Sequence, residues 1–112
     1  MRKVIIYGGA GFIGSALSSY LCAKGIEVWI VEKKGIRNEN RYQQICLLPA
    51  HIIECDLEEI DNLEKIIGEH DFDTFYQFAW DGTNGNRLID YSAQLQSVNY
   101  VLKSIRVAKQ MG

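Results

Sequence analysis

The stretch KVIIYGGAGFIGSAL, residues 3–17, decides the fold of this 112-residue chain. It places four glycines, Gly8, Gly9, Gly11 and Gly14, between an apolar, β-branched run and a segment with helical spacing. GxGxxG and GxxGxxG registers overlap here, and their position predicts a strand, a tight turn and a helix. Glycine in the turn permits positive φ angles, and Gly14 permits the helix to pack closely on the sheet.

Short apolar runs alternate with longer amphipathic segments along the rest of the chain. The pattern predicts strands at 3–7, 27–31, 51–55 and 74–79, and helices at 12–24, 59–68 and about 90–110, with a loop and a short helix within 35–48. An apolar stripe through Ile13, Leu17 and Leu21 is expected to be the buried face of the first helix. This order predicts an α/β fold: a Rossmann-type, doubly wound parallel sheet of strand order 3-2-1-4 with helices on both faces.

Composition predicts one domain over residues 1–112 and limits its partners. The formal net charge is −2, and the scattered Lys and Arg residues form no basic face, so nucleic acid is not expected as a partner. No segment has the roughly 18 consecutive apolar residues of a membrane span, which predicts no membrane partner and a cytoplasmic location. Cys22, Cys46 and Cys55 lack metal-ligand spacing and are interpreted as reduced and partly buried. The acidic residues within 56–64 are interpreted as favourable charge at a helix N-terminus, so no metal site is expected.

The glycine turn and the end of the second strand together predict a dinucleotide site. Main-chain N–H groups and the positive end of the helix dipole favour a pyrophosphate, which Gly11 allows to come close. Glu32 stands where a carboxylate accepts hydrogen bonds from the adenosine ribose. Its charge favours NAD over NADP, while Lys33 and Lys34 leave NADP as an alternative. No GK[ST] follows the glycines, which excludes a P-loop, and flavin and S-adenosylmethionine remain alternative ligands.

Three motifs carry a resemblance to a known family. YGGAGFIGSAL is similar to a TGGAGFIGS opening, with Tyr7 in place of the usual small or hydroxyl residue, FYQFAW at 75–80 is similar to VIHLAA, and SVNYVLKSIRVAKQMG at 97–112 is similar to NVxGTxNLLEAA. The family is the extended short-chain dehydrogenase/reductases, or NAD-dependent epimerase/dehydratases of nucleotide sugars. The chain resembles their N-terminal, cofactor-binding part only, so it is expected to be truncated, without the substrate-binding and catalytic part.

This resemblance, added to the assignments of Glu32 and Lys33, implies a set of cofactor-binding residues. Asp56 and Leu57 are placed at the adenine, and Ala79 and Trp80 toward the nicotinamide. The full set is Gly8, Gly11, Phe12, Ile13, Gly14, Glu32, Lys33, Asp56, Leu57, Phe78, Ala79, Trp80 and Asn99. For the full-length protein the resemblance also implies a nucleotide-sugar substrate, hydride transfer at a sugar carbon and a homodimer.

Catalytic residues are not expected in this chain. The family uses a Tyr and a Lys in YxxxK spacing that lie downstream of the region matched here. The chain has one such string, Tyr20 to Lys24, but it lies on the first helix, away from any nicotinamide, and is rejected. The chain alone is therefore expected to be inactive, and to self-associate along its fourth strand or its last helix. The alternative interpretation is a stand-alone NAD(P)-binding sensor or regulatory module without catalysis.

Overall fold

The computed structural model of the chain describes residues 1–33, 40–79 and 91–112. The elements in chain order are β1 (Lys3–Tyr7), α1 (Phe12–Ala23), β2 (Glu27–Glu32), α2 (Asn40–Ile45), β3 (His51–Glu54), the 3₁₀ helix η1 (Leu57–Asn62), α3 (Leu63–Ile67), β4 (Thr74–Gln77) and α4 (Tyr91–Met111).

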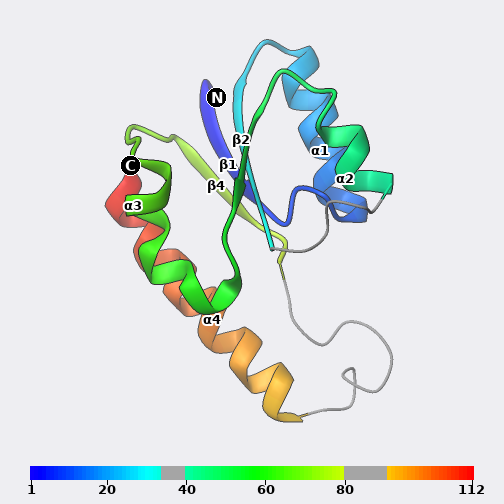
Figure 1. Ribbon diagram of the computed structural model, residues 1–112. Helices are drawn as coiled ribbons and strands as arrows, with labels where there is room; N and C mark the ends of the chain where they lie inside the picture. Colours follow the sequence, from blue (N-terminus) through cyan, green and yellow to red (C-terminus); the bar gives the residue numbers. More distant parts are fainter. Residues whose placement is uncertain (34–39, 80–90) are drawn as a thin grey trace.

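The four strands form one parallel sheet in the order β3-β2-β1-β4 (Figure 1), which confirms the predicted topology. Ile5 in β1 is paired with Trp29 in β2 and with Phe75 in β4, and Ile30 in β2 is paired with Ile52 in β3. Because all four strands run the same way, their carboxyl ends lie along one edge of the sheet, at the bottom of Figure 1. In the described sheet β4 is an edge strand.

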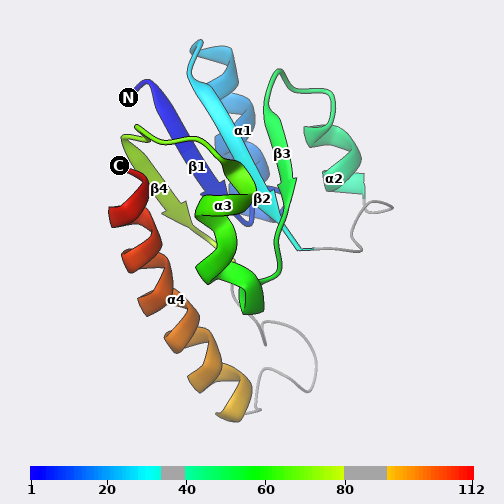
Figure 2. The ribbon, with the colours of Figure 1, turned by 60° about the vertical axis from the view of Figure 1, so that its left-hand side comes forward.

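Helices cover both faces of the sheet, with α1 and α2 on one side and η1, α3 and α4 on the other (Figures 1 and 2). Side chains of a strand alternate between the two faces, so Val4 and Ile6 lie in the core under α1 while Ile5 and Tyr7 lie in the core under α4. Both cores are apolar, which explains why the strands read as continuous hydrophobic runs.

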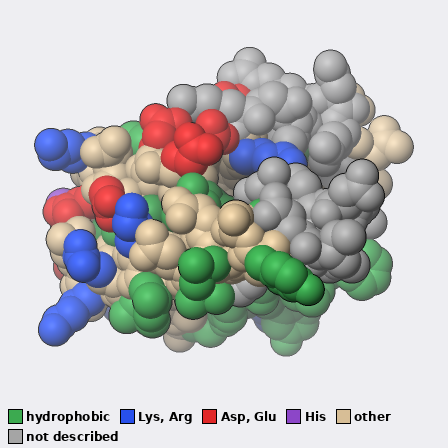
Figure 3. Space-filling view, turned by 90° about the horizontal axis from the view of Figure 1, so that it is seen from below, with side chains coloured by type: hydrophobic (Ala, Val, Ile, Leu, Met, Phe, Trp, Pro, Cys, Tyr) green, Lys and Arg blue, Asp and Glu red, His purple; other side chains and the backbone are tan. Residues whose placement is uncertain are grey.

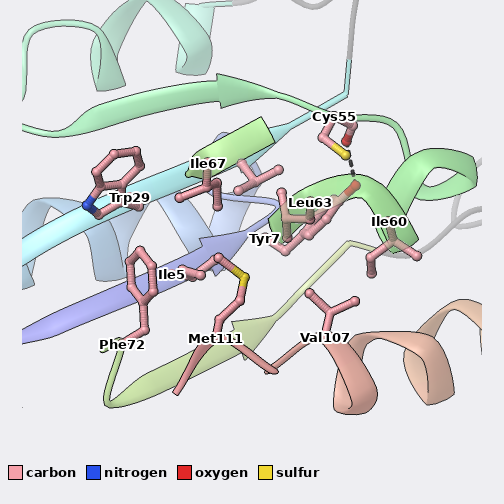
Figure 4. Close-up of a cluster of buried hydrophobic side chains, with 11 residues drawn as sticks. Ile5, Tyr7, Trp29, Cys55, Ile60, Leu63, Ile67, Phe72, Val107 and Met111 are labelled. Carbon is pink, nitrogen blue, oxygen red and sulfur yellow. Dashed lines mark hydrogen bonds between the residues drawn. The ribbon is translucent and has the colours of Figure 1, made fainter. Parts of the chain in front are cut away.

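The core under α4 is the larger cluster and reaches the carboxyl edge of the sheet. Figure 4 shows Tyr7 lying among side chains from η1, α3 and α4, including Ile60, Leu63 and Val107. At the other end of this cluster the rings of Trp29 and Phe72 meet edge to face with centroids 5.9 Å apart. Tyr7 is therefore a large core residue that lies at the carboxyl edge of the sheet.

The buried face of α1 differs from the predicted stripe. Ile13 is 62% exposed, and the buried residues are Gly14, Ser18 and Leu21. The first turn of α1 lies so close to the main chain after β1 that glycine, not isoleucine, takes the inward position. Ser18 is buried because its Oγ donates a hydrogen bond to the Gly14 carbonyl at 2.7 Å.

The helix predicted over 59–68 is instead two shorter elements. Leu57–Asn62 is a 3₁₀ helix, and Leu63–Ile67 continues as an α-helix that ends at Gly68 with a φ of 69°. Leu57 and Ile60 are spaced by three residues, which places them on one face of the 3₁₀ helix toward the core, and Leu63 at the start of α3 joins the same core.

Several predicted boundaries were close, and one assignment was wrong. Gly25, with a φ of 77°, follows α1 as expected, while β3 and β4 end before the predicted residues 55 and 79. All three cysteines are free, Cys55 is buried and Cys22 is half-buried, but Cys46 is exposed rather than partly buried. It follows the short α2, on which Ile45 takes the inward position.

Helix α4 has an exposed apolar stripe, and its N-terminal half extends past the sheet (Figures 1 and 2). The stripe consists of Tyr91, Leu95, Val98, Leu102 and Ile105, at alternating spacings of four and three residues. No helix in the described ranges is long and apolar enough to cross a membrane.

Candidate functional site

A cavity of about 330 Å³ lies at the carboxyl edge of the sheet, where β1 and β2 end. Its walls come from the turn after β1, the end of β2, the start of η1, the segment after β4, and α4. The lining residues are Tyr7, Gly8, Gly11, Glu32, Lys33, Asp56, Leu57, Glu58, Phe78, Ala79 and Tyr100. Figure 3 looks onto this end of the molecule and shows acidic side chains gathered beside a basic one.

The turn after β1 is shaped by glycine. Gly8 has a φ of 90°, and a Cβ atom there would lie 2.8 Å from the Ala79 nitrogen. Its N–H donates to the Val31 carbonyl at 2.8 Å, and its carbonyl accepts from the Gly11 N–H at 3.1 Å. The turn is thus held against both β2 and the segment after β4 by main-chain contacts.

Gly14 closes the turn from the helix side. A Cβ atom on Gly14 would overlap the Gly8 carbonyl oxygen and lie 2.9 Å from the Gly9 Cα. Both neighbours are main-chain atoms, which cannot move aside as a flexible side chain does. Only glycine therefore allows α1 to begin directly on the turn.

The N-terminus of α1 presents main-chain groups without a side-chain cap. The first i to i−4 hydrogen bond of the helix runs from the Ser15 N–H to the Gly11 carbonyl at 2.9 Å. The N–H of Ile13 lies ahead of that bond, at the positive end of the helix dipole. No side chain of Gly11 accepts from the helix, because it has none. Such a terminus suits an anionic group.

Glu32 joins the end of β2 to the glycine turn. One carboxylate oxygen accepts from the Ala10 N–H at 3.0 Å and the other from the Lys33 N–H at 3.0 Å. Its side chain is held in place in this way, and the residue is only 9% exposed. A carboxylate has about four acceptor positions, so two bonds leave capacity for a ligand that donates.

Tyr7 connects the central strand to the far wall of the cavity. Its hydroxyl donates to the Cys55 carbonyl at 2.5 Å, although β2 lies between the two strands. Burial raises the pKa of the Tyr7 phenol far above its ordinary value, and the neighbouring Cys55 and the carboxylates of Asp56 and Glu32 add to this rise. The hydroxyl is therefore protonated, and a hydrogen-bond donor, at neutral pH.

Most of the residues predicted for the cofactor site meet at this cavity, and some do not. Gly8, Gly11, Glu32, Lys33, Asp56, Leu57, Phe78 and Ala79 line it, and Gly14 lies beneath the turn. The side chains of Phe12 and Ile13 are 77% and 62% exposed and do not line it. Asn99 is exposed on α4, where its neighbour Tyr100 lines the cavity instead. Trp80 lies outside the described residues.

Sequence reasoning missed Tyr7, Glu58 and Tyr100 as lining residues. Tyr7 carried a signal, since it is a large residue at a position that is usually small. Glu58 follows the predicted pair Asp56 and Leu57, but its charge was assigned to a helix N-terminus. Tyr100 carried no signal, because the rotation of α4 is set by packing.

The charged side chains among the described lining residues suit the binding of a ligand more than the catalysis of a reaction. It supplies three carboxylates, Glu32, Asp56 and Glu58, and one cation, Lys33. The rejected pair Tyr20 and Lys24 lies at the other end of α1, where the Lys24 ammonium sits 5.4 Å from the centre of the Tyr20 ring. Among the described residues, no three or more His, Cys, Asp or Glu side chains are grouped to hold a metal ion.

Comparison with known proteins places these features in a family. A model described as the NAD dependent epimerase/dehydratase family matches residues 4–111. No sequence among the curated proteins matches this chain.

Solved structures share the fold. A UDP-glucose 4-epimerase from Bifidobacterium longum, in complex with NAD+ and UDP, is 24% identical, with 98% of this chain and 34% of that chain covered and a TM-score of 0.71. The epimerase Mth375 from Methanothermobacter thermautotrophicus is 22% identical, with coverages of 99% and 32% and a TM-score of 0.76. A dTDP-glucose 4,6-dehydratase double mutant from Streptomyces venezuelae, with NAD and DAU bound, is 21% identical, with coverages of 100% and 37% and a TM-score of 0.76. This chain spans about a third of the length of these proteins, and at such identities the likeness shows the fold alone.

The contact at Gly14 predicts that replacing this helical glycine by alanine lowers the free energy of unfolding instead of raising it. Alanine normally stabilises a helix by about 1 kcal/mol relative to glycine. We expect Gly14→Ala instead to lower the free energy of unfolding by about 1–3 kcal/mol, because its Cβ meets the main chain of the turn. Urea denaturation measures the difference. Ser19→Ala, on the exposed side of the same helix, is the control and should change stability by less than about 0.5 kcal/mol. A stabilised Gly14→Ala protein would contradict the packing described.

Proposed function

This chain belongs to the NAD dependent epimerase/dehydratase family, and from that premise we propose that it binds NAD as the cofactor-binding part of an enzyme that acts on a nucleotide sugar. The observation that carries the proposal is the cavity at the carboxyl edge of the sheet, where the glycine turn and Glu32 meet. Ligands of open α/β sheets bind at this edge, outside the carboxyl ends of the strands.

The residues present fit a dinucleotide. A side chain at Gly8 or Gly14 would collide with main-chain atoms. Because both residues are glycine, the turn leaves main-chain amide groups accessible at the start of α1. Glu32 is fixed by two main-chain N–H groups and keeps acceptor capacity for hydroxyl groups. Leu57 and Ala79 give the two sides of the cavity apolar surface.

Each part of the cavity has a proposed role. The main chain from Gly11 to Ile13 would hold the pyrophosphate, Glu32 the adenosine ribose, and Asp56 with Leu57 the adenine. Phe78 and Ala79, after the neighbouring strand β4, would face the nicotinamide half. When bound, NAD supplies a nicotinamide ring that accepts and returns a hydride, and this chain's residues bind and orient it.

The charges around the cavity favour NAD over NADP. Glu32 is nearly buried and held in a fixed place, whereas Lys33 is exposed. A carboxylate at the ribose repels a 2′-phosphate, and a solvated lysine offsets little of that repulsion because water screens it.

A nucleotide-sugar substrate and hydride transfer at a sugar carbon are proposals for the whole protein. Solved structures of this fold contain NAD together with UDP or DAU, and these ligands support a nucleotide sugar as the substrate. The rival proposal is an NAD(P)-binding sensor without catalysis. The family match favours the enzyme. A location in the cytoplasm stays a prediction.

Calorimetric titration of the 112-residue protein tests cofactor binding. We expect NAD to bind more tightly than NADP, and Glu32→Gln to weaken NAD binding by about tenfold, because hydrogen bonds to a charged group contribute about 1.5–3 kcal/mol. The NAD-to-NADP preference should fall at the same time, since the repelling charge is gone. Glu69→Gln, an exposed carboxylate that pairs with Lys3 away from the cavity, should leave NAD binding unchanged.

Two results would contradict this proposal. One is a wild-type protein that takes up FAD or S-adenosylmethionine but not NAD. The other is a Glu32→Gln protein that binds NAD as tightly as the wild type.

We also propose that a second copy of this chain packs on the exposed stripe of α4. Spacings that alternate between four and three residues are the pattern by which one helix packs along another. The stripe runs from Tyr91 to Ile105, and the N-terminal half of α4, which carries part of it, extends past the sheet. A parallel copy of the same helix offers the same apolar surface.

Light scattering after size-exclusion chromatography tests this contact. We expect the wild-type protein to form a dimer and the Leu95→Lys/Leu102→Lys protein to be a monomer, because two lysines would be buried without partners. Gln96→Lys/Gln110→Lys adds the same charge to exposed positions outside the stripe and should remain a dimer. A monomeric wild type would contradict this proposal.

A further inference from the structure

Tyr7 makes contacts with both walls of the cavity although only 1% of it is exposed. Its carbonyl accepts from the Phe78 N–H at 2.9 Å, which ties the central strand to the segment after β4. Its hydroxyl donates to the Cys55 carbonyl, which ties the same strand to the segment after β3, as the dashed line in Figure 4 shows. Tyr7 therefore spans the floor of the cavity from one wall to the other.

The segment held by the Tyr7 hydroxyl continues directly into the wall made by Asp56, Leu57 and Glu58. Cys55 donates its N–H to the Glu32 carbonyl at 2.9 Å, and its own carbonyl accepts the hydrogen bond from the Tyr7 hydroxyl. The next turn begins where the Glu59 N–H donates to the Asp56 carbonyl at 2.8 Å. The direction in which the wall leaves β3 thus depends on the hydrogen bonds of Cys55, which include those from its Sγ to the Asp56 and Glu59 carbonyls at 3.6 Å each.

We propose that Tyr7 is a positioning residue for the adenosine end of the cavity. By holding the Cys55 carbonyl from the central strand, it fixes the Asp56–Glu58 wall relative to the glycine turn, and so fixes how well an adenosine fits between them. The inference rests on the proposed binding of NAD. Burial raises the pKa of the phenol, so the hydroxyl is protonated at neutral pH and donates this bond.

Tyr7→Phe tests the proposal because it keeps the ring in the core and removes only the hydroxyl. The probes are NAD, AMP and inorganic pyrophosphate, titrated into the 112-residue protein and followed by amide chemical shifts. We expect affinity for NAD and for AMP to fall by the same factor, about three- to tenfold, which is the equivalent of one lost neutral hydrogen bond. Affinity for pyrophosphate, which contacts the glycine turn alone, should stay unchanged.

Tyr76→Phe is the matched control. It removes a phenol hydroxyl from the neighbouring strand, where that hydroxyl donates to the Met1 sulfur at 3.6 Å, on the other face of the sheet. Its affinity for all three ligands should equal that of the wild type. The proteins are compared at a temperature at which circular dichroism shows each of them to be folded.

Hydrogen exchange without ligand gives an independent measurement. In Tyr7→Phe the Glu59 amide should exchange faster than in the wild type, because the wall is less firmly held. The Gly68 amide, which bonds to the Glu64 carbonyl at the end of α3, should exchange at the wild-type rate.

The outcomes separate this inference from the proposed function. A wild-type protein that does not bind NAD overturns the proposed function, and the inference with it. If the wild type binds NAD, the inference alone is overturned when Tyr7→Phe weakens all three ligands equally or weakens none of them. A purely structural role would lower the melting temperature and leave the AMP-to-pyrophosphate ratio unchanged.

Discussion

The contact between the first turn of α1 and the main chain that follows β1 is the constraint on which the rest of this structure depends. Gly14 touches the Gly8 carbonyl and the Gly9 Cα with no room for a Cβ. Because of this contact the helix starts directly at the carboxyl edge of the sheet, with its N-terminal amides facing the same space as the ends of β2 and β3. A side chain at this point would push the helix away and open the turn.

A network of hydrogen bonds converts that contact into a cavity with defined walls. Gly8 is bonded to β2 through Val31, and Glu32 at the end of β2 accepts from Ala10 in the turn. Tyr7 then connects the central strand to Cys55 after β3. The walls after β2, β3 and β4 are each joined to the glycine turn by these hydrogen bonds, which include the one from the Phe78 N–H to the Tyr7 carbonyl. The cavity and the fold's central packing contact therefore depend on the same few residues.

The sequence predicted the fold to the level of strand order, and it located most of the cavity. Alternating apolar runs fix where parallel strands lie, and the end of each strand then fixes which residues share the carboxyl edge, as for Glu32 and Asp56. The features that the sequence did not predict depend on how neighbouring elements pack against one another. The inward position of Gly14 in place of Ile13, the 3₁₀ turn at Leu57–Asn62 and the approach of Tyr100 follow from how elements rotate against one another, which periodicity does not encode.

The most direct test of this account is the map of backbone amide chemical shifts on addition of NAD. The largest changes should fall on the amides of Gly11 and Ile13 at the start of α1, on Lys33 after β2, and on Leu57 after β3. The amides of Lys3 and Asp73, at the opposite edge of the sheet, should not move. Changes confined to that opposite edge, or none at a saturating NAD concentration, would show that the glycine turn does not hold a dinucleotide.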